Sequence, residues 1–301
     1  MEYEAFKEAV LAGVQEIYGG AATARVKRLL KNNGCHYDGI LTAPRGEEES
    51  VCPAIPLEWF YRLYKRGDMS VAGCAQTVCK ISEEHRELGN VLKILQENRY
   101  WEQVKGSIYP VLLSTKENQE VLENLAATPM LDMSVAYIIR KEAGERCIGI
   151  KVSRTMLEAY GVSVEQLHGQ ALENLRGDGY EFCEIQSFVT RLGCQVPEEL
   201  DIRWTGEEEK VFVFTNTVNF YGAAGILDRK RVREFAVGRD FFILPSSIHE
   251  TIFVLAEDKN DIEKYSSIVR MVNRTALDEE QRLSDHAYFY DAAADEIRVC
   301  I

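Results

Sequence analysis

Apolar residues recur every three or four positions in several parts of the chain, which is the spacing of one buried helix face. A Gly-Gly pair ends the first such segment, and Ser-Val-Glu-Gln at Ser163 is a capping box that satisfies free backbone donors at a helix start. The apolar face of the first segment consists of Phe6, Val10, Val14 and Ile17. The sequence predicts helices over residues 3–18, 56–66, 70–96, 115–125, 154–160, 164–176, 228–237 and 261–273.

Shorter apolar runs between turn signals predict strands. Asn32-Asn33-Gly34 separates two of them, and Asn-Gly readily adopts the positive φ angles of a hairpin turn. A second polar turn runs from Asn216 to Asn219, beside Gly222, where a glycine permits close backbone approach. Residues 176–209 are interpreted as a partly irregular connection, or as a sign that a strand is missing. The predicted strands cover residues 26–30, 35–42, 108–113, 134–140, 147–152, 211–215, 221–227, 241–244, 251–255 and both arms of a last hairpin in 286–300.

Consecutive strands joined by short turns favour an α+β fold, with antiparallel sheets built from β-hairpins and helices packed on one face. The stretch FFILPSSIHETIFVLA, residues 241–256, is expected to be the central hairpin. Two regions are expected: residues 1–130, with the first helix, hairpin and helical segments, and residues 131–301, with most of the sheet; one continuous domain is the alternative. A hairpin followed by a helix recurs at 134–160 and 211–237, so a pseudo-repeat of pattern is one interpretation.

Composition narrows the class of protein. A chain of 301 residues with 46% hydrophobic content can bury a sizeable core. Its apolar runs are shorter than the roughly 18 residues of a membrane span, and its acidic start does not resemble a signal peptide. Eight cysteines without a repeated short spacing indicate reduced thiols and therefore a cytoplasmic protein. The net charge of −13 disfavours nucleic-acid binding, and the basic run at residues 229–233 is interpreted as a solvated helix face.

The polar insert of the central hairpin holds the strongest candidate for chemistry. Ser246 or Ser247 as nucleophile, His249 as base and Glu250 as carboxylate are the residue types of hydrolytic catalysis. In an extended segment Ser247 and His249 point to one face while Glu250 points away, so this strand cannot complete a triad by itself. The alternatives are a ligand-binding or partner-binding loop and a turn whose hydroxyls satisfy local backbone groups.

Two asparagine pairs complete the candidate site. Asn32 and Asn33 lie at one predicted hairpin tip and Asn216 and Asn219 at another, where they either orient a ligand or simply form the turn. If these tips converge with the Ser-His insert, they make one polar binding edge. The five histidines have no HxH or HExxH spacing and no standard phosphate-binding loop is present, so neither a metal nor a cofactor is expected.

Five segments together resemble a bacterial family, the domain-of-unknown-function family 5688, typical of gut-dwelling Gram-positive anaerobes. The resemblance spans nearly the whole chain but carries no activity, and it implies a bacterial, cytoplasmic protein encoded by a chromosome or a mobile element. Residues 161–175 and the ending LSDHAYFYD also resemble a second family of unknown function, of the YtpQ type. The segments that carry the first resemblance are KNNG (31–34), PAIPLEWFYRLYKRG (53–67), VSVEQLHGQALENL (162–175), FTNTVNFYGAAGIL (214–227) and FFILPSSIHE (241–250).

From these residues we expect a non-enzymatic binding or adaptor protein that recognises a protein or a small ligand through polar hairpin tips. A hydrolase using Ser246 or Ser247 with His249 is the rival hypothesis. A mobile-element defence or counter-defence factor is the third, and only the setting of the family favours it. The sequence leaves the oligomeric state open.

Overall fold

A computed structural model describes residues 1–46, 54–84, 100–143, 146–185, 187–188, 210–255 and 262–300. The chain divides into two compact units, Met1–Arg99 and Tyr100–Ile301. The boundary expected near residue 130 lies inside the second unit, because residues 108–114 pair with residues 133–139 of a neighbouring strand.

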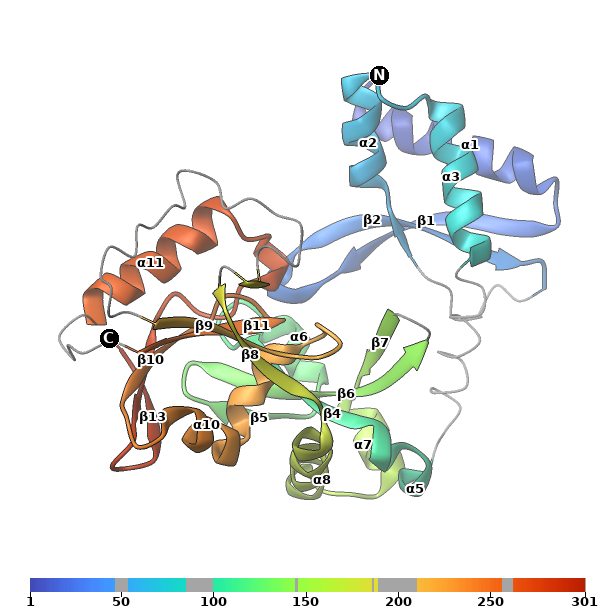
Figure 1. The fold of residues 1–301 in the computed structure, drawn as a ribbon. Helices are drawn as coiled ribbons and strands as arrows, with labels where there is room; N and C mark the ends of the chain where they lie inside the picture. Colours follow the sequence, from blue (N-terminus) through green and yellow to red (C-terminus); the bar gives the residue numbers. More distant parts are fainter. Residues whose placement is uncertain are drawn as a thin grey trace. The chain divides into compact units, whose positions relative to one another are not determined.

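The first unit is a three-stranded antiparallel sheet with helices over one face (Figure 1). The predicted hairpin around Asn33 is confirmed: its two strands pair over nine residues each, and Asn33 takes the left-handed conformation with φ of 59°. The elements of this unit are α1 (Tyr3–Tyr18), β1 (Ala22–Leu30), the 3-10 turn η1 (Asn32–Gly34), β2 (His36–Pro44), β3 (Ile55–Pro56), α2 (Leu57–Arg66) and α3 (Val71–Glu84).

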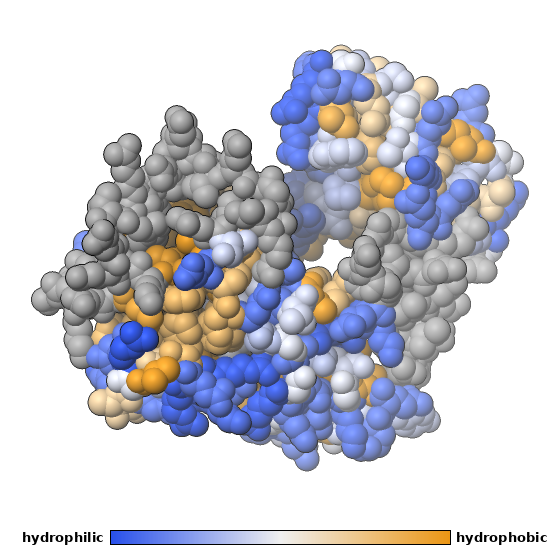
Figure 2. Space-filling view, in the orientation of Figure 1, coloured by the Kyte–Doolittle hydropathy of each residue, from blue (hydrophilic) through white to orange (hydrophobic). Residues whose placement is uncertain are grey.

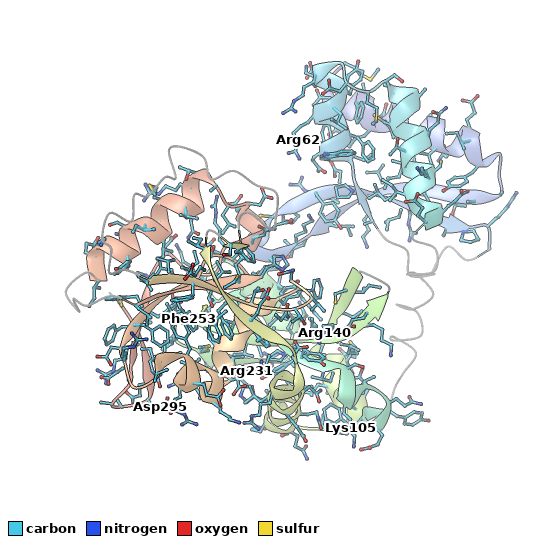
Figure 3. All side chains as sticks on the ribbon, in the orientation of Figure 1. Arg62, Lys105, Arg140, Arg231, Phe253 and Asp295 are labelled. Carbon is cyan, nitrogen blue, oxygen red and sulfur yellow. The ribbon has the colours of Figure 1, made fainter. Side chains whose placement is uncertain are left out.

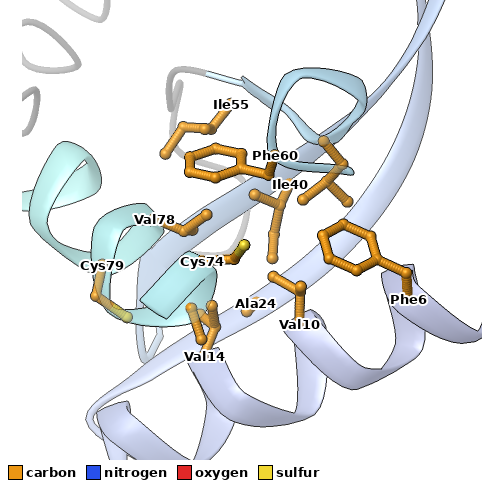
Figure 4. Packing of buried hydrophobic residues seen from close by; sticks show 12 residues of the cluster. Phe6, Val10, Val14, Ala24, Ile40, Ile55, Phe60, Cys74, Val78 and Cys79 are labelled. Atoms are coloured by element: carbon orange, nitrogen blue, oxygen red, sulfur yellow. The ribbon is translucent and has the colours of Figure 1, made fainter. Parts of the chain in front are cut away.

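One face of α1 builds the core of this unit (Figure 4). Phe6, Val10 and Val14 are fully buried and pack with Ile40 of β2 and residues of α2 and α3. Full burial of a large apolar side chain stabilises the fold by about 2 kcal/mol. Ile17, which the helical spacing placed on the same face, is 49% exposed because α1 ends one residue later.

The second unit contains two antiparallel sheets. In the larger sheet the strand order is β13-β12-β10-β11-β9-β8, and in the smaller one β6 pairs with β4, β5 and β7. The elements are α5 (Trp101–Val104), η2 (Lys105–Ser107), β4 (Ile108–Ser114), α6 (Gln119–Asn124), β5 (Ala127–Met130), β6 (Met133–Ala143), β7 (Arg146–Lys151), α7 (Arg154–Tyr160), α8 (Val164–Gly177), β8 (Tyr180–Glu184), β9 (Lys210–Asn216), η4 (Gly222–Leu227), α10 (Arg229–Ala236), β10 (Phe241–Leu244), β11 (Glu250–Leu255), α11 (Ile262–Thr275), η5 (Glu279–Gln281), β12 (Tyr288–Asp291) and β13 (Glu296–Val299).

The α+β class with antiparallel sheets is confirmed, but helices cover both faces of the six-stranded sheet. Phe242 packs on Tyr265 of α11 with ring centroids 4.5 Å apart, while its neighbour Phe241 packs on Phe235 of α10 at 5.1 Å. Adjacent residues of a strand point to opposite faces. All four residues of β10 are buried, so each face needs a cover, and helices on one face alone would leave aromatic rings in water.

The expected central hairpin is confirmed, whereas the hairpin expected just before it is wrong. β10 and β11 are adjacent and antiparallel in the middle of the larger sheet. Residues 222–227 form the 3-10 turn η4 instead of a strand, and β9 pairs with β8 and β11. The apolar run YGAAGIL is therefore buried as a turn, and 211–237 is not a hairpin followed by a helix. β8 is the strand missing from the predicted connection, most of whose later residues lie outside the described ranges.

Asp132, in the turn between β5 and β6, ties the two sheets of the second unit together. Its carboxylate accepts hydrogen bonds from the hydroxyls of Tyr288 on β12 at 2.5 Å and of Ser284 at 2.7 Å. Burial, with the nearby Asp132 charge, raises the pKa of Tyr288, so this phenol stays a donor. Among the described residues, no helix is long and apolar enough to span a membrane.

Candidate functional site

Asn216 closes the loop that leads from β9 into η4. Its amide nitrogen donates to the Phe220 carbonyl at 2.9 Å, and its amide oxygen accepts from the Phe220 backbone N–H at 3.0 Å. Asn216 is only 2% exposed, so its side chain serves the loop itself. Asn219 lies at the exposed tip with φ of 49°. Of this asparagine pair, only Asn219 is in a position to meet a ligand directly.

The insert between β10 and β11 is held by backbone hydrogen bonds. Ser247, which is 2% exposed, donates its backbone N–H to the Glu250 carbonyl at 3.1 Å, and its hydroxyl oxygen accepts from the His249 backbone N–H at 2.9 Å. The Ile248 backbone N–H donates to the Gln281 carbonyl at 2.9 Å. Ser246 and Glu250 are half-buried. The insert is therefore a fixed turn.

His249 joins this insert to the loop after β9. Its Nδ1 accepts from the Tyr221 backbone N–H at 3.2 Å, and its carbonyl accepts from the Thr215 hydroxyl at 2.9 Å. The rings of Phe220 and Tyr221 lie 6.4 and 5.8 Å from the imidazole. Because Nδ1 is an acceptor, the proton of the neutral ring is on Nε2. Within the described residues Nε2 has no hydrogen-bond partner, so it is a donor of fixed direction.

Gly222 allows the two loops to lie this close. A Cβ at this position would lie 2.5 Å from the Thr215 Oγ1, 2.7 Å from the Asn216 backbone nitrogen and closer still to the His249 carbonyl oxygen. Real Cβ atoms do not approach other atoms so closely. Gly222 therefore permits close backbone approach, as the sequence indicated, and the atoms that approach it belong to Thr215, Asn216 and His249.

The geometry does not pair a serine with the histidine. The Ser247 hydroxyl is bonded to a backbone group, and the imidazole Nδ1 is bonded to another. In the part of the chain that the structure describes, no hydrogen bond joins Ser246 or Ser247 to the His249 ring. The insert therefore has the parts of a hydrolase without the nucleophile–base contact that activates a serine.

Asn32 and Asn33 belong to the first unit. Both are buried, at 7% and 8% exposure, in the turn between β1 and β2, and the Asn33 carbonyl accepts a weak hydrogen bond from the Cys35 thiol at 3.8 Å. The other candidate residues belong to the second unit. Convergence of the three tips stays a prediction. No group of three or more His, Cys, Asp or Glu side chains in the described ranges is arranged to hold a metal ion.

The second unit also contains a buried ion-pair network that the sequence did not reveal, and Figure 3 labels two of its residues, Arg140 and Arg231. Arg140 of β6, with its side chain 6% exposed, donates two hydrogen bonds of 2.7 Å to the Asp178 carboxylate, just after α8. Its guanidinium lies 3.5 Å from the centroid of the Tyr109 ring. Burial disfavours the charge of Arg140, but the Asp178 carboxylate outweighs it and raises the pKa of Arg140.

Arg231 of α10 extends the network to the backbone. It donates to the carbonyls of Arg176 and Asp178 at 2.7 Å each, and its Nε lies 3.3 Å from an Asp228 carboxylate oxygen. These bonds tie α8, α10 and β6 together. The contacts join residues up to 55 positions apart along the chain, so periodicity and short motifs carry no signal of them.

The basic run on α10 is neutralised locally. Arg229 and Arg233 both contact Asp295, Arg233 at 2.8 Å. Lys230 lies 3.7 Å from Glu234. Figure 2 shows mostly hydrophilic residues over the lower part of the second unit, where Figure 1 places α8 and α10. The run is thus part of a mixed-charge surface.

We expect the pKa of the His249 imidazole to lie below the usual histidine value of about 6.5. Burial lowers its pKa, although the carboxylates of Glu250 and Glu280 oppose this shift. A lowered folded pKa means that the unfolded chain binds the proton more tightly. The contribution of His249 to stability is therefore present above about pH 6.5 and is lost as the pH falls through the folded pKa.

NMR titration of the imidazole carbons measures this pKa, with His249→Asn identifying the resonance. Urea unfolding of wild type and His249→Asn from about pH 5 to 7.5 measures the linkage. The two are expected to be about equally stable near pH 7.5, and wild type is expected to become the less stable of the two toward acid pH, because only wild type carries the titrating imidazole. A His249 pKa at or above the free-histidine value would contradict the expectation.

A family model described as a family of unknown function, DUF5688, matches residues 3–292. No curated protein and no solved structure matches the chain. These comparisons give no support to the likeness to the YtpQ-type family.

Proposed function

Since the chain belongs to the DUF5688 family, whose function is unknown, we propose that it is a non-enzymatic binding protein whose ligand contacts lie on the loops 216–222 and 245–250. One observation carries the proposal: His249 is held by Nδ1 in a fixed orientation, with Nε2–H as a donor for which the described residues supply no acceptor. A rigid donor loses little conformational entropy when a ligand binds, which favours recognition.

The surroundings of His249 indicate which ligands fit. Its proton on Nε2 requires an acceptor, such as an amide carbonyl of a peptide or small molecule. Glu250 and Glu280 lie near enough to influence the imidazole charge, and they disfavour an anion. The flanking rings of Phe220 and Tyr221 offer apolar contact. The proposed ligand is therefore neutral or cationic, with a hydrogen-bond acceptor. Because the six described cysteines are free thiols, we also propose a cytoplasmic location.

Two substitutions separate the roles of the imidazole nitrogens. His249→Asn places an amide oxygen where Nδ1 accepts the Tyr221 N–H, but removes the donor at Nε2. His249→Gln can place an amide N–H near Nε2, but gives up the Nδ1 acceptor. We expect the Asn variant to keep wild-type stability and lose ligand, and the Gln variant to lose about 1 kcal/mol of stability and keep ligand.

The measurement is quantitative capture from source lysate with immobilised wild-type and variant chains, scored as the amount of each retained protein or small molecule. Wild-type ligands that fall roughly tenfold for His249→Asn, but not for His249→Gln, support the proposal. Equal retention by wild type and His249→Asn contradicts it. Turnover of an ester, amide or phosphoester substrate that disappears in both Ser247→Ala and His249→Asn would replace it with the hydrolase hypothesis.

A further inference from the structure

The outer edge of β1 is an unpaired strand edge in the first unit. β1 lies at the end of the β1-β2-β3 order and, among described strands, pairs only with β2. It is nine residues long, which is long for an edge strand. A strand edge presents backbone donors and acceptors to any extended chain that approaches it.

The register identifies which backbone groups face outward. The backbone N–H of Arg45 donates to Ala21, and that of Lys31 donates to Cys35, so odd-numbered β1 residues exchange hydrogen bonds with β2. Even-numbered residues therefore direct their backbone groups to the outer edge. The Gln15 side chain fills one of these positions, donating to the Ala24 carbonyl at 3.2 Å.

The outward groups beyond Ala24 are those of Val26, Arg28 and Leu30. Within the described part of the chain, no residue bonds to them. Three successive outward residues accommodate an added strand of about five residues, joined to the edge by four to six backbone hydrogen bonds, as a rough estimate.

The charge of this edge differs from that of the chain as a whole. β1 carries Arg25, Lys27 and Arg28 and no acidic residue, whereas the chain has a net charge of −13. Lys27 and Arg28 are exposed and have no ion pair among the described residues. Asp38, opposite Arg28 on β2, is engaged by Lys7 at 2.8 Å.

We propose that the β1 edge binds an extended acidic segment of a partner protein, which adds to the sheet as a fourth strand. Backbone hydrogen bonds to Val26, Arg28 and Leu30 hold the segment, and its carboxylates lie opposite Lys27 and Arg28. Opposite charges across neighbouring strands stabilise the pairing. The edge belongs to the first unit and the His249 loops to the second, so the inference is argued from different residues and does not depend on the proposed ligand of those loops.

A second copy of the chain fits this edge less well. Antiparallel pairing of two β1 strands about Val26 would place Arg25 opposite Lys27 of the second copy, and Lys27 opposite Arg25. Like charges directly opposite destabilise a strand pair. The charge of the edge therefore favours an acidic partner.

The test uses the full chain and a fluorescent threonine-rich peptide of about ten residues with two adjacent central glutamates, with binding read by anisotropy. Adjacent strand residues point to opposite faces, so one glutamate can lie opposite Lys27 and the other opposite Arg28. The Lys27→Glu/Arg28→Glu variant is expected to bind roughly tenfold more weakly, because two attractive cross-strand pairs become repulsive. A peptide N-methylated on alternate amides keeps its charge but cannot form the backbone hydrogen bonds to the edge. Its binding to wild type is expected to be at least as weak as the binding of the unmethylated peptide to the variant.

The matched control is Arg66→Glu/Lys80→Glu, which makes the same charge change at exposed positions of α2 and α3 and is expected to bind like wild type. Circular dichroism verifies that both variants fold. The proposal is overturned if wild type does not bind the peptide, if the methylated peptide binds equally well, or if the control variant is weakened as much. Sedimentation that shows self-association abolished by Lys27→Glu/Arg28→Glu would assign the edge to a second copy instead.

Discussion

Gly222→Ala is expected to lower the free energy of unfolding of the second unit by about 4 kcal/mol. The new methyl group meets the Thr215 hydroxyl, the Asn216 backbone nitrogen and the His249 carbonyl oxygen, all well inside van der Waals contact. Two of these atoms are backbone, so no side-chain rotation relieves the clash. Either the 216–222 loop or the 245–250 insert must move, and the Nδ1 bond from Tyr221 to His249 is lost with that movement.

Urea unfolding followed by circular dichroism measures this effect, with Gly169→Ala as the control. Gly169 lies inside α8, is exposed, and has open space where a Cβ would be added. That substitution is expected to raise stability by about 1 kcal/mol through helix propensity. If Gly222→Ala unfolded at the wild-type urea concentration, the two loops would not be in the close contact described here.

Arg140→Met is expected to cost about 3 to 5 kcal/mol, because it leaves the Asp178 carboxylate buried without its partner. The two side chains are 6% and 10% exposed and share two hydrogen bonds of 2.7 Å. An uncompensated buried charge costs more than an intact pair contributes. The double variant Arg140→Met/Asp178→Leu is therefore expected to be more stable than the single variant.

The control is Arg298→Ala, at a pair of the same type on the surface. The Arg298 side chain is 57% exposed and lies 3.4 Å from Asp291 and 3.3 Å from Glu296. Solvent screening limits its contribution to less than about 1 kcal/mol. A thermal or urea denaturation series that gave Arg140→Met and Arg298→Ala the same loss would mean that the Arg140 pair is not buried in solution.

Several elements could be predicted because their signals are local. The α1 face of Phe6, Val10 and Val14, the Asn-Gly turn between β1 and β2, and the capping box at Ser163 depend on residues within a few positions of one another. Each is specified by backbone preference or helical spacing. The central hairpin was likewise visible in two apolar runs around a polar insert.

The hairpin expected over residues 211–227 is wrong because the apolar stretch YGAAGIL is buried as a 3-10 turn and not as a strand. Its glycines let a 3-10 turn lie flat against β9, where a Cβ at Gly225 would overlap the rings of Tyr180 and Phe214. A short apolar run does not distinguish a strand from a buried turn. β8 was missed because it is only five residues long and contains two glutamates, in a stretch rich in acidic residues and glycine.

By itself, the sequence determined the antiparallel α+β class, the central hairpin and the residue types of the candidate site, because these follow from spacing and chain chemistry. Only the tertiary structure decided what those residues do. In the folded chain the Ser247 hydroxyl accepts from a backbone N–H, the His249 Nδ1 accepts from the Tyr221 backbone N–H, and Arg140 forms an ion pair with Asp178. Hydrogen bonds between distant segments depend on how strands and helices pack, and that packing leaves no periodic trace along the chain.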